Sequence, residues 1–136
     1  MSAADHLRAE QFVNRVRATG GATMNLRTGK LVNPGTRAYM VGGEPDKSGV
    51  RIPTHAVPAD EFAAKHVEEA AALLREATGN RARVHLGAWQ DDGNVEIDAS
   101  SVTRRRGEAI RKGRNRNEKA IWDNKHMREV DTGGRG

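Results

Sequence analysis

The sequence predicts an α+β fold: a single small domain in which short antiparallel strand pairs are interleaved with three helices. The chain has 136 residues, which fits one domain. Short runs that alternate apolar and polar residues come in pairs joined by turn residues, as antiparallel strands do. Three longer segments carry apolar residues at helical spacing instead. The expected order is α-βββ-α-ββ-α-ββ, with a sheet covered mainly on one face.

The first quarter of the chain predicts a helix followed by a meander. The helix is expected over residues 5–17, because its apolar residues gather on one side and Gly20-Gly21 ends it. Three short strands separated by turn residues are expected next, at 24–26, 31–32 and 37–41. Residues 42–58, which contain prolines and several glycines, are expected to connect this meander to the next helix.

The clearest element is a helix over residues 59–78. Pro58 suits a first helical turn, Asp60 and Glu61 suit the positive end of the helix dipole, and Gly79 suits the C′ position. The apolar residues that share one face at 3.6 spacing are Phe62, Ala63, Val67, Ala70, Leu73, Leu74 and Ala77. Phe62, Leu73 and Leu74 are therefore expected to be buried.

A hairpin is expected after this helix. Residues 84–88 and 95–99 alternate in polarity, and Asp92-Gly93 between them provides the positive φ of a tight turn. Trp89 and Trp122, the two tryptophans of the chain, each follow or lie in a predicted strand beside apolar neighbours. Both are expected to pack in the core.

The last quarter predicts a short helix and a final strand pair. Ser100 or Ser101 can cap a helix of about ten residues that turns Ala109 and Ile110 inward. Strands are expected over 120–123 and 126–130, so the domain would span residues 1–131, and residues 132–136 would form a flexible tail.

Composition excludes several classes of protein. The chain has no cysteine, which excludes disulfides, thiolate metal sites and a cysteine nucleophile. No apolar stretch approaches the roughly 18 residues of a membrane span, and the N-terminus lacks the apolar run of a signal peptide. No membrane partner is expected.

The five histidines do not predict a metal site. A histidine site needs two ligands on one face and a third ligand, and none of the five has that spacing. The chain also lacks a phosphate loop and a nucleophile elbow. No cofactor, metal or catalytic residue is therefore expected.

One acid–base arrangement remains as a hypothesis. Asp98 ends a strand on the face opposite Val95 and Ile97, and His85 would lie on the corresponding face of the partner strand, so that a patch of His85, Glu96 and Asp98 could carry acid–base chemistry. The simpler interpretation is the solvent-exposed face of a half-buried hairpin.

The positive charge of the chain lies in its last quarter. Residues 1–100 carry 12 basic and 13 acidic side chains, whereas residues 101–136 carry 11 and 5. The predicted contact set for an anionic or protein partner is Arg104, Arg105, Arg106, Arg111, Lys112, Arg114 and Arg116. Such an array can neutralise phosphates without reading sequence. Because stacking aromatics are missing from this run, contact with a protein or plain solvation is favoured over nucleic acid.

Two segments, residues 20–43 and 86–123, are similar in sequence to a group of known proteins. The second holds a tryptophan-bearing strand, an Asp-ended strand, an arginine-and-glutamate helix and an Ala-Ile-Trp-Asp strand, and its matching positions are Gly87, Trp89, Val95, Ile97, Asp98, Glu108, Ala109, Ala120, Ile121, Trp122 and Asp123. Together the segments, a little under half the chain, resemble a group of small proteins encoded by actinobacterial phages and prophages and associated with virion or head-assembly genes.

The resemblance, the lack of a catalytic constellation and the positive last quarter together predict a non-enzymatic phage protein. It would be a minor virion or head-assembly accessory component in the virion or the host cytoplasm, acting through contacts with other phage or host proteins. The resemblance implies no catalytic residues. The alternative is a basic nucleic-acid-binding or host-directed phage regulatory protein that uses the arginine-rich helix 103–116. A third hypothesis is a small enzyme or toxin-like domain built around His85, Glu96 and Asp98.

Overall fold

A computed structural model describes residues 2–135, which form three helices and seven strands in one antiparallel sheet. The helices are α1 (Ala3–Thr19), α2 (Ala64–Ala77) and α3 (Arg106–Asn115). The strands are β1 (Gly21–Asn25), β2 (Tyr39–Gly42), β3 (His55–Pro58), β4 (Val84–Asp91), β5 (Asn94–Thr103), β6 (Ala120–Asp123) and β7 (Arg128–Asp131). The structure confirms the predicted single small α+β domain.

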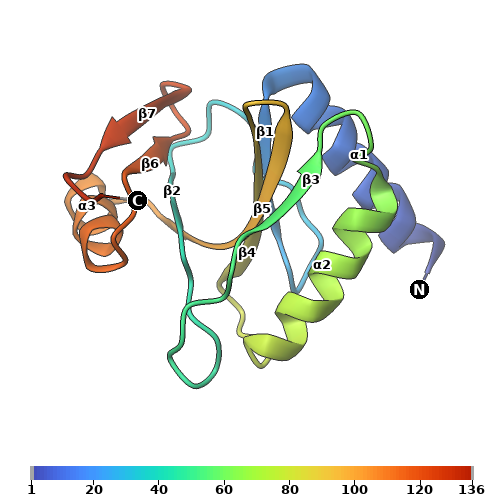
Figure 1. Ribbon diagram of the computed structural model, residues 1–136, viewed down its shortest axis with the longest axis horizontal. Helices are drawn as coiled ribbons and strands as arrows, with labels where there is room; N and C mark the ends of the chain where they lie inside the picture. The colour runs from blue at the N-terminus through green and yellow to red at the C-terminus, as the bar shows by residue number, and fades with distance from the viewer. Residues whose placement is uncertain (1, 136) are drawn as a thin grey trace.

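The hairpin of β4 and β5 forms the centre of the sheet (Figure 1). Its turn is the predicted Asp92-Gly93 pair, both with positive φ, at 48° and 80°. The sheet order is β1-β4-β5-β2-β6-β7, and β3 also pairs with β5. The free edge of β5 is thus shared, since β3 pairs with residues 94–97 and β2 with residues 100–103.

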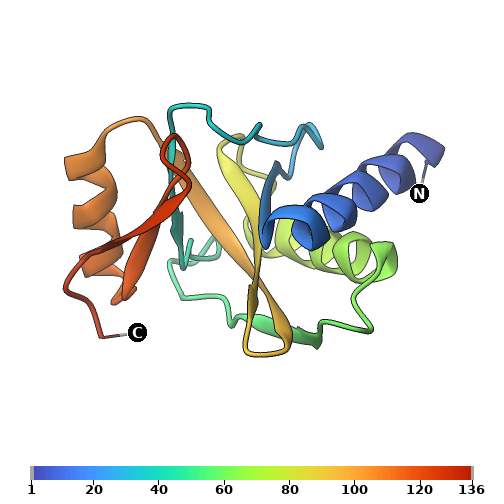
Figure 2. The ribbon, with the colours of Figure 1, turned by 90° about the horizontal axis from the view of Figure 1, so that it is seen from above.

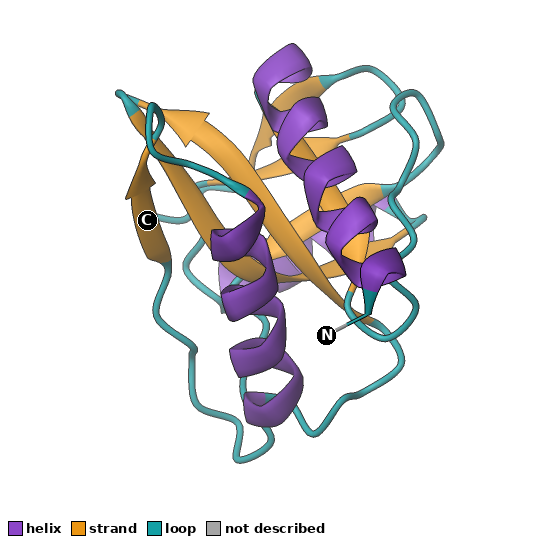
Figure 3. Ribbon diagram, turned by 90° about the vertical axis from the view of Figure 1, so that its right-hand side faces the viewer, coloured by secondary structure: helices purple, strands orange, loops and turns teal. Residues whose placement is uncertain are grey.

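Two helices cover one end of the sheet (Figure 3). Phe12 and Val16 of α1 and Val67 and Leu74 of α2 are buried against the same face of β4 and β5, where Leu86 is fully buried. The apolar face of each helix and the inward-facing residues of the strands make one core between these layers.

A second, smaller core lies at the other end of the molecule (Figures 1 and 2). It consists of Val41 of β2, Ala109 of α3, Ile121 of β6 and Val130 of β7. Gly113 lets α3 approach the sheet closely, since a Cβ there would lie 2.7 Å from the Thr132 side chain. α3 thus covers the β2-β6-β7 end, where α1 and α2 do not reach.

The predicted meander over residues 22–41 is wrong. Residues 31–32 form no strand and contribute only an isolated bridge between Leu31 and Met24. The third expected strand exists as β2, but it pairs with β5 and β6 instead of returning beside β1. The segment 42–58, expected to be a connection, ends in strand β3. Local alternation marks a strand but does not specify its partner.

The second helix is confirmed, but its start and its buried face differ from the prediction. α2 begins at Ala64, and Pro58 ends β3, an edge strand in which a proline is tolerated. Phe62 and Leu74 are buried, whereas Leu73 is 68% exposed. The face of α2 that packs inward is made of Val67, Ala70, Ala71 and Leu74, so the expected burial of Leu73 is wrong.

The last quarter contains two further corrections. β5 continues to Thr103, so Ser100 and Ser101 are strand residues, and α3 begins only at Arg106. The predicted flexible tail, 132–136, is wrong for Thr132, which is 1% exposed and donates its N–H to the Lys119 carbonyl at 3.1 Å. Gly136 lies outside the described residues.

Candidate functional site

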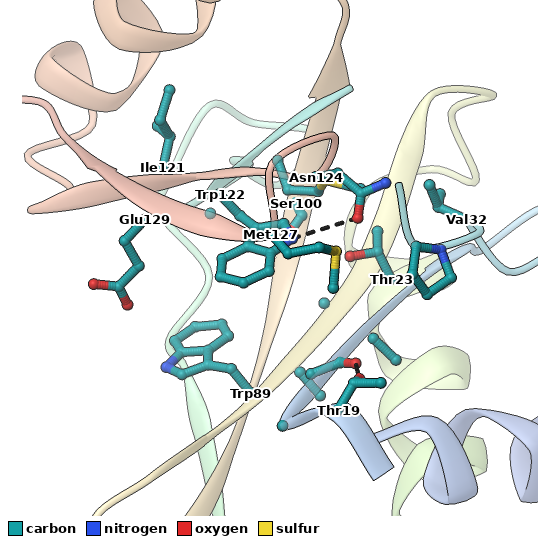
Figure 4. A pocket seen from close by; sticks show the side chains of 18 of the residues that line it. Thr19, Thr23, Val32, Trp89, Ser100, Ile121, Trp122, Asn124, Met127 and Glu129 are labelled. Carbon is teal, nitrogen blue, oxygen red and sulfur yellow. Dashed lines mark hydrogen bonds between the residues drawn. The ribbon is translucent and has the colours of Figure 1, made fainter. Parts of the chain in front are cut away.

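A groove of about 300 Å³ lies on the face of the sheet opposite the cores (Figure 4). Strand residues alternate between the two faces, so Leu86 and Ala88 point to the core, whereas Gly87 and Trp89 point into this groove. We define the groove by lining residues from β1, β2, β4, β6, β7 and the adjoining turns: Gly21, Thr23, Met40, Gly42, Gly87, Trp89, Glu118, Ala120, Trp122, Met127 and Glu129.

Both tryptophans of the chain belong to the groove. The Trp89 side chain from β4 is 38% exposed, and that of Trp122 from β6 is half-buried and donates its indole N–H to Asn124 Oδ1 at 3.4 Å. Figure 4 shows the two indole rings one above the other, with the Met127 side chain beside them. The prediction that both tryptophans pack in the core is therefore wrong, most plainly for Trp89.

The floor of the groove depends on glycine. A Cβ at Gly42 would lie 2.7 Å from Asp98 Oδ2, and one at Gly87 would lie 2.6 Å from Ser100 Oγ. A larger residue at either position would displace the polar side chain of β5 beneath it. These two glycines leave room for the Asp98 and Ser100 side chains under the floor of the groove.

The charges of the groove leave one carboxylate free. Glu118 binds Arg51 at 3.0 Å, and the guanidinium of Arg15 donates to the Val32 carbonyl at 2.9 Å. Glu129 of β7 is exposed and forms no ion pair with any residue in 2–135. In Figure 4 its carboxylate lies beside the two indole rings. The charge beside the indole rings is therefore negative, whereas the charge of Arg15 is held at Val32, on the opposite side of the groove in Figure 4.

Asp98 lies beneath the groove and is 3% exposed, so the solvent-exposed interpretation of its face is wrong. Its Oδ2 accepts the Gly43 N–H at 2.9 Å. Burial raises the pKa of Asp98 to about 6; the Gly43 N–H opposes this rise, and the nearby Glu118 carboxylate adds to it. This carboxyl group is the most strongly perturbed acid described in the protein.

The hypothetical acid–base patch does not assemble around Asp98. The three residues share a sheet face as predicted, but His85 Nδ1 contacts the Arg83 carbonyl at 2.8 Å and burial lowers the pKa of His85. In the strand register His85 lies opposite Ser100, and Glu96 lies opposite Trp89. No hydrogen bond joins His85, Glu96 and Asp98 among residues 2–135, so nothing in this geometry supports concerted proton transfer by the three.

The seven basic residues of the predicted contact set separate into two groups. Arg116 is turned inward, where its guanidinium binds Glu44 at 2.7 Å and Ser101 Oγ at 2.9 Å. Arg114 donates to the Thr132 carbonyl at 2.5 Å, and Lys112 lies 3.6 Å from Glu108. Arg116 and Arg114 thus tie α3 and the residue after it to other segments, whereas Lys112 forms only an exposed pair within α3.

The other four basic residues remain available for a partner. Arg104, Arg105, Arg106 and Arg111 are exposed, and none of their side chains forms a hydrogen bond or ion pair within residues 2–135. We call these four residues the arginine surface. It lies along the start of α3, at the end of the molecule away from α1 and α2 (Figure 1).

Glu44 joins several segments through the inward-facing arginine. It binds Arg116 at 2.7 Å and Arg81 at 3.1 Å, and it accepts the Ser101 hydroxyl. Burial alone would raise the pKa of Glu44, but the Ser101 hydroxyl and the two guanidinium groups outweigh it and lower the pKa. This network fixes the end of α3 to β2 and β5.

Within residues 2–135, no three His, Asp or Glu side chains gather where they could hold a metal ion. None of the helices described there has both the length and the apolar character needed to cross a bilayer.

Comparisons of the chain with protein-family models, curated proteins and solved structures found no match. The function is therefore argued from the groove and the arginine surface themselves.

The sequence contained one signal for the groove. Val84, Leu86 and Ala88 alternate inward, which places Trp89 on the opposite face together with His85. The approach of β6, which brings Trp122 to the same hollow, depends on pairing with β2 across about 80 residues of chain.

Proposed function

We propose that this protein is a non-enzymatic phage accessory component, of the virion or of head assembly, that recruits a partner protein through the groove. One observation carries the proposal: both tryptophans of the chain leave the core and line an open hollow. Tryptophan is the residue most enriched among those that dominate protein interfaces. The resemblance of residues 20–43 and 86–123 to phage-encoded proteins supports the phage assignment.

The composition of the groove favours binding over catalysis. Large side chains, Trp89, Trp122 and Met127, surround a floor of small residues. Methionine and aromatic side chains are common where a protein adapts to a partner segment. Among residues 2–135, Asp98 is the one strongly perturbed acid, and no base there lies within hydrogen-bond distance of it.

The test is incorporation into particles. Particles produced by the host that encodes the gene would be purified and analysed by mass spectrometry, with the parent protein, Trp89→Ala or Leu73→Ala expressed in place of the native copy. Leu73 is the matched control, because it is an exposed apolar residue on α2, remote from the groove. We expect the parent and Leu73→Ala in assembling or mature particles and Trp89→Ala to be depleted.

Two results would contradict the proposal. Equal incorporation of Trp89→Ala would remove the groove as the docking site. A protein found in no particle and no assembly intermediate, with particle yield unchanged when the gene is deleted, would remove the phage accessory role.

The second candidate function is nucleic-acid binding by the arginine surface. The observation that favours it is the exposure of Arg104, Arg105, Arg106 and Arg111 without an intramolecular partner. Such a surface would bind phosphates without sequence preference. Its test is the dependence of DNA binding on salt, argued in the Discussion.

A further inference from the structure

We propose that the groove binds the guanidinium group of an arginine side chain presented by the partner protein. The inference rests on the proposed function, because it names the chemistry of the segment that would dock there. It is carried by three features on one face of the sheet: two indole rings, a free carboxylate beside them, and the position of the one described lining cation, Arg15, which is held at the Val32 carbonyl away from that carboxylate.

The two indole rings favour a cationic ligand. Trp89 and Trp122 both line the groove, and Figure 4 shows their indole rings as neighbours on it. The face of an indole attracts a cation more strongly than that of any other aromatic side chain, and arginine takes part in such contacts more often than lysine. A planar guanidinium can also stack on an aromatic face, which an ammonium cannot.

The carboxylates of the groove also favour a positively charged ligand. Glu129 is exposed beside the indoles with no ion pair in residues 2–135, and Glu118 lies deeper with Arg51 on it. A guanidinium bound at the opening would give Glu129 a charge-assisted hydrogen bond. An anionic occupant such as a phosphate would instead meet this negative charge directly.

The remaining lining residues agree with a cationic occupant. Arg15 is the one basic residue lining the groove in the described chain, and it already donates to the Val32 carbonyl at 2.9 Å. Arg15 keeps its positive charge, but this contact holds its guanidinium at Val32, across the groove from Glu129 and the indole rings in Figure 4, where an incoming guanidinium would bind. The volume, about 300 Å³, is at the small end of ligand sites and suits a long side chain with its neighbouring residues.

The tryptophans also make the experiment direct. The chain has two tryptophans and both line the groove, so all indole fluorescence and both indole N–H signals in an NMR spectrum report on it. The 136-residue chain would be titrated with a capped Gly-Arg-Gly peptide and with the same peptide carrying citrulline, a neutral analogue of arginine of nearly the same shape. A Gly-Lys-Gly peptide serves as the third ligand.

We expect saturable changes in both indole signals with the arginine peptide. Binding of the citrulline peptide should be at least about fivefold weaker, since a cation–π contact and a charged hydrogen bond are lost together. The lysine peptide should bind between the two. Glu129→Gln should weaken the arginine peptide about fivefold, and Glu76→Gln, at an exposed carboxylate of α2 away from the groove, should leave binding unchanged.

The outcomes separate this inference from the proposed function. Equal binding of citrulline and arginine peptides, or no effect of Glu129→Gln, would overturn the inference while leaving the groove as a docking site for a neutral segment. The absence of an indole response to any peptide would also overturn the inference. The proposed function would be contradicted as well only if Trp89→Ala were incorporated into particles normally. Concentration-dependent self-association that Trp89→Ala abolishes would make a second copy of this chain the occupant and overturn the assignment to a separate partner.

Discussion

The Asp98 carboxylate accepts the Gly43 N–H at 2.9 Å through Oδ2, while its Oδ1 meets no hydrogen-bond donor among residues 2–135. The contact joins the middle of β5 to the end of β2, at the point where β3 leaves the edge of β5. An ionised carboxylate that is buried and only half satisfied opposes folding. Asp98 therefore makes stability depend on pH.

Asp98→Asn should remove part of this dependence. The folded pKa, about 6, is higher than the ordinary value of 3.8, so the folded protein binds a proton at Asp98 more tightly than the unfolded chain does. This contribution to the free energy of unfolding is complete below about pH 4 and is lost as the pH rises through 6. Asparagine is neutral at every pH and keeps this contribution. The free energy of unfolding of the variant, relative to that of the parent, should therefore rise by up to about 3 kcal/mol between pH 4 and 7.5.

The measurement is urea denaturation of both proteins across this pH range. The lowered pKa of His85 has the opposite effect on stability. The unfolded chain binds a proton at His85 more tightly than the folded protein does, so the free energy of unfolding falls as the pH falls. This effect is present in both proteins and cancels in the difference. Parallel stability curves for parent and variant would contradict the buried, raised-pKa assignment of Asp98.

Two neighbouring leucines of α2 should differ sharply when truncated. Leu74 is 7% exposed and packs in the first core, so Leu74→Ala should lower the free energy of unfolding by about 2–5 kcal/mol. Leu73 is 68% exposed, so Leu73→Ala should change it by less than about 0.5 kcal/mol. Thermal or urea unfolding of both variants measures this difference. Similar losses of stability in the two variants would contradict the assignment of Leu74 to the buried face of α2 and Leu73 to the exposed face.

The leucines also show what the sequence can predict. The fold class and the β4-β5 hairpin are confirmed because alternation and the Asp92-Gly93 turn are local signals. The helical period of residues 64–77 is local too, but which face is buried depends on the packing of α1 across it, where Ala70 and Ala71 turn inward. A pattern of leucines alone could not fix that phase.

The pairing of distant strands lies beyond such local signals. β2 joins β5 and β6, and β3 occupies the rest of the edge of β5 with Pro58 at its end. Strand alternation is the same whichever neighbour a strand takes, and a proline can stand at an edge. Local signals do not predict the groove for this reason. It forms only because side chains of β4 and β6 lie close together on the same face of the sheet.

The arginine-rich segment was found by composition, but its members have different roles. Arg116→Ala should lower the free energy of unfolding by about 3 kcal/mol, since it leaves the Glu44 carboxylate without its closest cation in a largely buried network. Arg111→Ala is the matched control, an exposed and unpaired arginine of α3 in the same segment, and should change stability by less than about 0.5 kcal/mol. Equal effects in urea denaturation would contradict this division.

The arginine surface gives the final prediction, in which the two candidate functions differ. If Arg104, Arg105, Arg106 and Arg111 each neutralise a phosphate of duplex DNA, log K should fall against log salt with a slope near about −3.6, about −0.9 for each phosphate. That slope amounts to roughly a hundredfold loss of affinity between 50 and 200 mM salt. We expect only weak, non-specific DNA binding at 150 mM salt, because four phosphate contacts are strongly weakened at this salt concentration and Glu108 lies on the same helix as the arginine surface.

Fluorescence anisotropy with a labelled duplex, read across a salt series, measures this slope. Arg104→Glu with Arg111→Glu tests the surface without disturbing the fold, since neither side chain has a partner in residues 2–135. Trp89→Ala provides the comparison, because it alters the groove and leaves the charge of α3 unchanged. Sub-micromolar binding at 150 mM salt that the double glutamate variant loses and Trp89→Ala keeps would make nucleic-acid binding the better assignment, since the affinity would then depend on these guanidinium groups and not on the groove.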